Sequence, residues 1–176
     1  MGDKTQLLSL VLAARFRRPV PVIAGILVAT LLNHAVAGAL GAWLQGLITP
    51  TVLRWILGLS FLAMAAWVLV PDRLDEADTP AVASRLGVFG ATLVVFFLAE
   101  MGDKTQIATV ALAARYDAVA IVVVGTTLGM MLANVPVVLL GERIVRRVPI
   151  GVVRRIAAGV FVVLGVLVLL DAGSLF

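Results

Sequence analysis

The sequence predicts an all-α membrane protein whose six transmembrane helices form two inverted three-helix repeats. Of its 176 residues, 62% are hydrophobic, and the mean hydropathy is +1.13, whereas soluble domains are close to half apolar. Several stretches with almost no charge approach or reach the ~20 residues that cross ~30 Å of hydrocarbon. A polar motif also occurs twice, 100 positions apart, as Met1-Gly2-Asp3-Lys4-Thr5-Gln6 and as Glu100-Met101-Gly102-Asp103-Lys104-Thr105-Gln106.

The first predicted helix, residues 5–15, is too short to cross a membrane. About 11 residues span roughly 16 Å as a helix. Its counterpart in the second half, residues 86–115, is a full-length segment with the motif in its middle. We therefore expect the first helix to be truncated, lacking its leading half and the glutamate that would precede Met1. The alternative is a native protein that begins in the middle of the membrane.

The remaining helices follow from apolar runs bounded by prolines and charges. Pro136 is expected to kink the fifth helix, because proline removes a helical hydrogen bond. The predicted helices after the first cover residues 20–45, 52–70, 86–115, 118–140 and 152–170. The predicted domains are a first three-helix repeat (1–70), a polar linker (71–85) and a second three-helix repeat (86–176).

The 100-residue offset extends well beyond the motif. The segment 12–15 recurs at 112–115, and Arg54 recurs as Arg154. Because each unit has three helices, the second must enter the membrane from the opposite side, as in the inverted repeats of transporters. Most arginines fall on one side, which the positive-inside rule makes cytoplasmic. Both termini are then outside, in what we expect to be a bacterial plasma membrane.

Composition also excludes several classes of function. A net charge of +4 and a pI near 10.7 could indicate nucleic-acid binding in a soluble protein, but in a membrane protein they mark cytoplasmic loops. We therefore expect no nucleic-acid partner. The absence of cysteine excludes disulfides and thiolate metal sites. The sequence contains no nucleotide-binding glycine loop, serine–histidine triad or zinc signature.

The intact motif places hard oxygen donors in an apolar segment. On a continuous helix, Glu100, Asp103 and Lys104 would share one face. Gly102 would permit a break that frees backbone carbonyls. Thr105 would add a hydroxyl oxygen and Gln106 an amide oxygen to the two carboxylates. Oxygen donors of these kinds suit Ca²⁺, Mn²⁺ or Mg²⁺.

A purely structural interpretation is that the two acids pair with Lys104 and pin two helices together. Burying such charges in a membrane costs a few kcal/mol per residue, and their duplication favours a functional site. Two full motifs would carry four carboxylates and two lysines, a net charge of −2. That charge balances one divalent cation or two protons, which predicts exchange by alternating access. Without the first glutamate the net charge is −1.

Other polar residues in the apolar runs have two interpretations. His34 is either a proton relay or cation ligand, or a hydrogen-bonded interior histidine. Interhelical hydrogen bonds are the default role for Asn33, Asn134 and Gln45. Trp43, Trp55 and Trp67 are expected to anchor the membrane interfaces.

At the duplicated motif, the chain resembles the Gdt-like family of E-x-G-D-K-T membrane proteins, and the resemblance covers the whole chain. Its members are regarded as secondary transporters of Ca²⁺ or Mn²⁺ in exchange for protons. The resemblance implies cation-site roles for Glu100, Asp103, Thr105, Asp3 and Thr5. The resemblance implies supporting roles for Gly102, Lys104, Gln106, Gly2, Lys4 and Gln6. The missing glutamate before Met1 is the one departure from the family pattern.

The leading hypothesis is therefore a transporter, not an enzyme, that exchanges Mn²⁺ or Ca²⁺ for protons and holds no tightly bound cofactor. Its partners would be the cation, protons and the lipid bilayer, with homo-oligomerisation left open. The alternative is an intramembrane metal-dependent enzyme acting on lipid phosphate, although no nucleophile or base is evident beyond the metal ligands. A third hypothesis is a small amino-acid or cation exporter of another six-helix family.

Overall fold

The computed structural model describes residues 3–70, 86–116, 118–141 and 150–170, and the described chain is helical throughout apart from turns. The predicted linker, residues 71–85, lies outside the described residues. The helices are α1 (Asp3–Phe16), α2 (Pro19–Leu47), α3 (Pro50–Val68), α4 (Gly87–Glu100), α5 (Lys104–Arg115), α6 (Val119–Leu140) and α8 (Ile150–Leu169).

Four of these helices are long and apolar enough to cross a membrane. They are α2, α3, α6 and residues 151–169 of α8. The helix α4 is apolar but has only 14 residues, and α1 and α5 have 14 and 12. The prediction of an all-α membrane protein is therefore confirmed.

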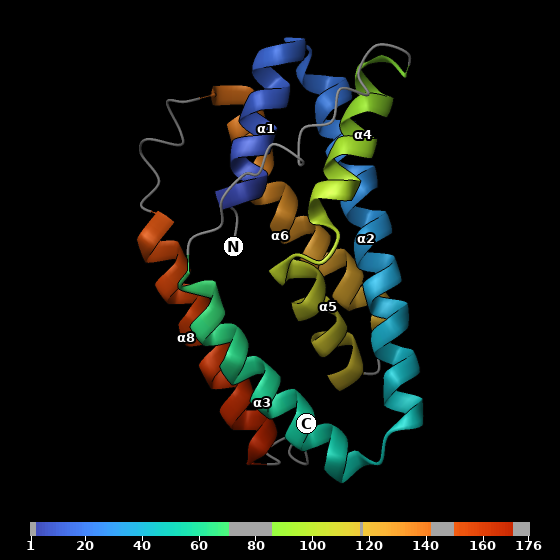
Figure 1. Cartoon of the computed structure of the whole chain (residues 1–176), viewed down its shortest axis with the longest axis vertical. Coiled ribbons are helices and arrows are strands. Elements are labelled where there is room, and N and C mark those ends of the chain that lie inside the picture. Colours follow the sequence, from blue (N-terminus) through green and yellow to red (C-terminus); the bar gives the residue numbers. More distant parts are fainter. Residues whose placement is uncertain (1–2, 71–85, 117, 142–149, 171–176) are drawn as a thin grey trace.

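The segment 86–115, predicted as a helix in which Gly102 would permit a break, does contain that break. Helix α4 ends at Glu100, and α5 begins only at Lys104. Gly102 between them has φ +77°, a left-handed conformation that glycine adopts without steric cost. The break lies near the middle of the bundle, beside α2 (Figure 1).

Two pairs of helices begin at positions related by the 100-residue offset. Helix α2 starts at Pro19 and α6 at Val119, while α3 starts at Pro50 and α8 at Ile150. The two prolines occupy first-turn positions, where their missing N–H groups cost no helical hydrogen bond. The helix α1 begins at Asp3 and α5 at Lys104, one residue from the same offset.

The helices form two groups (Figure 1). Helix α2 runs along the first group and packs against α4, α5 and α6, while α3 and α8 lie side by side and reach the first group mainly through α5. Helices α3 and α8 are antiparallel, because Gly58 lies against Leu169 and Gly165 against Leu62. Between them, the rings of Phe61 and Phe161 stack with centroids 6.2 Å apart.

The two buried apolar clusters divide at the helix break. The first joins α1, α2, α4 and α6 and contains Leu8, Leu12, Val22, Ile26, Ala29, Val95, Phe96, Ala99 and Val138. The second joins α3, α5 and α8 and contains Leu57, Phe61, Met64, Ala65, Ala108, Ala111, Ala114, Phe161 and Val168. Helix α4 belongs to the first cluster and α5 to the second, so the motif lies at the junction of the two.

Small residues bring α2 and α5 together, which is the usual way that helices pack in membranes. A methyl group added at Gly41 would meet the backbone carbonyl of Val110 and lie 2.9 Å from Ala113 Cβ. We expect Gly41→Ala to lower the thermal midpoint of the detergent-solubilised protein, because overpacking of this kind costs about 1–3 kcal/mol.

The matched control is Gly46→Ala in the same helix, where nothing lies within 4 Å of the added methyl. This variant should keep or raise the midpoint, because alanine is the better helix former by about 1 kcal/mol. Size-exclusion recovery after heating measures both variants. Equal midpoints would contradict the close approach of α2 and α5.

Candidate functional site

The helix break is held by hydrogen bonds on both of its sides. Asp103 is the N-cap of α5, and its carboxylate accepts from the Thr105 backbone N–H at 3.5 Å. From the first turn of α5, Gln106 Oε1 reaches back and accepts from the Gly102 N–H at 2.7 Å. At the end of α4, Asn33 Nδ2 donates to the Phe97 carbonyl at 3.1 Å. Three backbone groups at the break are thus paired with side chains of the protein.

The two acids of the intact motif meet at one hydroxyl group. Thr105 Oγ1 lies 2.9 Å from Asp103 Oδ2 and 3.4 Å from Glu100 Oε2. Glu100 is only 1% exposed, and its other oxygen, Oε1, is buried with no hydrogen-bond partner among the described residues. A negative group at the start of α5 is also favoured by the helix dipole.

Lys104 does not share a helix face with the two acids, so that prediction is wrong. The break separates Glu100 from Lys104, and the ammonium points to the end of α3. There Lys104 Nζ donates to the Val70 carbonyl at 2.8 Å and lies 5.4 Å from the centroid of the Trp67 ring. A cation at the carboxyl end of a helix pairs with its free carbonyls and its dipole.

The first copy of the motif lies at the start of α1. Thr5 is buried, at 2% exposed, and Gln6 Nε2 donates to the Ala133 carbonyl at 3.4 Å. The charge of Lys4 has a smaller electrostatic influence on the Glu100 carboxylate than burial or the charge of Asp103. Residues 1–2 and the side chain of Asp3 lie outside the described part.

Two polar side chains from the sequence analysis make interhelical contacts. Asn33 bonds to α4, as described above. Asn134 Oδ1 accepts from Ser9 Oγ of α1 at 2.9 Å. The expected structural role of these two amides is confirmed. The specific role of Asn33 at the helix break has no signal in the sequence, since its acceptor Phe97 is apolar and 64 residues away.

The described residues contain no cluster of three His, Cys, Asp or Glu side chains that could hold a metal ion. The oxygen donors at the break are instead the carboxylates of Glu100 and Asp103 and the hydroxyl of Thr105. Such hard oxygen donors suit Ca²⁺, Mn²⁺ and Mg²⁺. The arrangement resembles the discontinuous helices that bind ions in transporters.

Comparison with known proteins shows the family of the chain. A family profile described as "Divalent cation/proton antiporter GDT1" matches residues 1–76 and 88–175. A Vibrio cholerae protein described as a "Putative manganese exporter" is 52% identical over 165 residues, which cover 93% of this chain and 81% of that protein.

More distant relatives occur in plants. The "GDT1-like protein 4" of Oryza sativa subsp. indica is 28% identical over 186 residues, covering 92% of this chain and 65% of the rice protein. The japonica protein of the same name matches equally. No solved structure shows a significant match. The chain is thus an integral membrane protein that belongs to the GDT1 family of divalent cation/proton antiporters, which are transporters and not enzymes.

Proposed function

We propose that this chain exchanges a divalent cation for protons, with Glu100, Asp103 and Thr105 as cation ligands. The observation that carries the proposal is the Glu100 carboxyl, which is 1% exposed and has an oxygen without a hydrogen-bond partner among the described residues. An isolated carboxylate in such a place is costly unless a cation or a proton neutralises it. One buried group can therefore serve both substrates in turn.

The charges at the break support exchange. Glu100 and Asp103 together carry two negative charges, which one divalent cation or two protons neutralise. Because both substrates need the same oxygens, binding of one displaces the other. Gly102, Lys104 and Gln106 support the ligands by holding the break open.

The first motif copy supplies the remaining proposed ligands, Asp3 and Thr5, with Gly2, Lys4 and Gln6 in support. Burial of Thr5 and the electrostatic influence of Lys4 on Glu100 favour a site shared by both copies. The family description names divalent cation and proton as substrates, and the Vibrio relative is named for manganese. We therefore put Mn²⁺ ahead of Ca²⁺ as the transported cation.

The proposed architecture is a pair of inverted repeats, residues 1–70 and 86–176, joined by the linker 71–85. Inversion makes equivalent helices antiparallel. Helices α3 and α8 fulfil this, and the equivalent residues Phe61 and Phe161 stack on each other. Helices α2 and α6 fulfil it too, because Gly38 lies against Val119 and Val123 whereas His34 contacts Thr127.

We also propose a place and an orientation for the chain. The arginine-rich segments would face the cytoplasm and both termini the outside, by the positive-inside rule. The membrane would be a bacterial plasma membrane, as the Vibrio relative supports. Alternating access would then move α3 and α8 against the remaining helices, with the cation at the junction of the two groups.

The first test neutralises each acid in proteoliposomes that contain a pH-sensitive dye, with Mn²⁺ added outside. We expect Glu100→Gln and Asp103→Asn each to lower Mn²⁺-driven proton movement about tenfold or more, because a charged ligand contributes more than the ~1.4 kcal/mol that tenfold represents. Asp78→Asn in the linker is the control and should keep wild-type flux. Wild-type flux in both site variants would overturn the proposal.

The second test concerns the hydroxyl that joins the two acids. Thr105→Val keeps the shape of the side chain but removes the oxygen, so it should reduce the same flux about tenfold. Thr105→Ser restores the oxygen and should recover most of the flux. If valine and serine gave equal flux, the hydroxyl would have no role in cation binding.

A further inference from the structure

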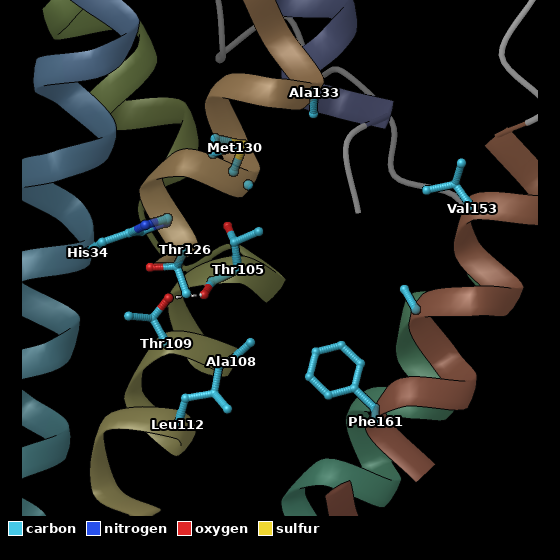
Figure 2. Close-up of a pocket in the computed structure, with 12 residues that line it drawn as sticks. His34, Thr105, Ala108, Thr109, Leu112, Thr126, Met130, Ala133, Val153 and Phe161 are labelled. Atoms are coloured by element: carbon cyan, nitrogen blue, oxygen red, sulfur yellow. Dashed lines mark hydrogen bonds between the residues drawn. The ribbon is translucent and has the colours of Figure 1, made fainter. Parts of the chain in front are cut away.

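A cavity of about 360 Å³ lies between the two groups of helices, next to the motif. Its polar walls come from His34 of α2, Thr105 and Thr109 of α5, and Thr126 of α6, and the rest of the lining is apolar. Figure 2 shows His34 extending from α2 toward Thr126 and Thr105, with Phe161 and Val153 on the far side. The cavity is large enough for a cation that retains some of its water.

His34 is the one nitrogen donor of this lining. It is 1% exposed, and its Nδ1 lies 3.4 Å from Thr127 Oγ1. Its other nitrogen, Nε2, is buried and has no hydrogen-bond partner among the described residues. When Nδ1 donates its proton to Thr127, Nε2 presents a lone pair, which is how a second hydrogen bond orients a metal-binding imidazole.

Thr105 connects this imidazole to the acids of the motif. Its side chain lines the cavity, and its hydroxyl contacts both Asp103 and Glu100. Thr105 therefore lies between the two carboxylates and the cavity, which we call the chamber. A cation that moves from the carboxylates past Thr105 would enter this chamber and meet one nitrogen donor, His34.

The hydroxyls of the chamber can supply further ligands. Thr109 and Thr126 donate their protons to carbonyls of their own helices at 2.8 Å, so their oxygen lone pairs remain as acceptors. One imidazole and several hydroxyls form a mixed nitrogen and oxygen donor set. Ca²⁺ takes oxygen ligands, whereas imidazole favours transition metals.

The imidazole of the chamber has no counterpart in the second half of the chain. The position equivalent to His34 in the second half is Asn134, which is engaged with Ser9 and with the Met130 carbonyl at 2.9 Å. The only histidine of the sequence thus lies beside the complete motif.

We propose that His34 Nε2 is a direct nitrogen ligand of the transported cation in this chamber, and that it makes the path prefer a transition-metal ion such as Mn²⁺ over Ca²⁺. This inference rests on the proposed function. A histidine that only fills the core would satisfy its second nitrogen within the protein, which His34 does not do among the described residues.

Electron spin-echo envelope modulation of bound Mn²⁺ tests the proposal on the unaltered chain. The protein is purified in detergent without a histidine tag, loaded with Mn²⁺ alone, and compared with protein labelled with ¹⁵N-histidine. Because His34 is the only histidine, replacement of a ¹⁴N modulation by a ¹⁵N modulation identifies it as the ligand. We expect this isotope change, and its absence from a bound-Mn²⁺ spectrum would overturn the proposal.

Flux measurements test the role of His34 in transport. His34→Asn installs the residue found at the equivalent position, Asn134, and should lower Mn²⁺ flux about tenfold or more. Even residues that only hydrogen-bond to a metal ligand contribute 10- to 100-fold to metal affinity. Ca²⁺ flux should change much less. Equal loss of both fluxes would overturn the selectivity role.

The two proposals fail in different ways. Bound Mn²⁺ without imidazole coupling rejects the His34 ligand and leaves exchange at Glu100 and Asp103 intact. Mn²⁺ that neither binds nor moves protons in the wild-type protein rejects the proposed function and this inference together.

Discussion

Backbone groups released by the helix break at residues 101–103 need partners inside the protein, because hydrocarbon offers none. Three side chains supply such partners, two from the break itself or the turn after it and one from α2. Gln106 pairs with the N–H group of Gly102, Asn33 with the Phe97 carbonyl, and Asp103 with the Thr105 N–H. The break is therefore a fixed element of the structure, and the carboxylates beside it take their positions from it.

The break also connects the two groups of helices. Helix α4 packs in one apolar cluster and α5 in the other. Lys104, the first residue of α5, is bonded to the Val70 carbonyl at the end of α3. The first residue of α5 is thus tied to the end of α3, directly beside Asp103. This geometry suits a transporter, in which the binding site must open to one side at a time.

Much of this fold could be predicted from the sequence. The long helices follow from apolar runs bounded by prolines and charges, and the predicted starts of α2, α3, α6 and α8 lie within two residues of the observed ones. Gly102 indicated where a break was permitted, but not that it occurs. The direction of Lys104 and the bond from Asn33 to Phe97 could not be predicted, since both depend on which helices pack together. Hydropathy is nearly uniform around these helices and carries no such information. For the same reason, the sequence left His34 with two interpretations.

The stack of Phe61 on Phe161 joins two positions that the offset makes equivalent. In a dimer of identical three-helix units, this contact would form between a residue and its own copy. One substitution would then change both sides of the contact at once. In a fused chain the two positions vary independently, so one half can acquire a histidine where the other keeps an asparagine. Duplication within one gene thereby permits a site with different donors on its two sides, which an exact two-fold dimer cannot build.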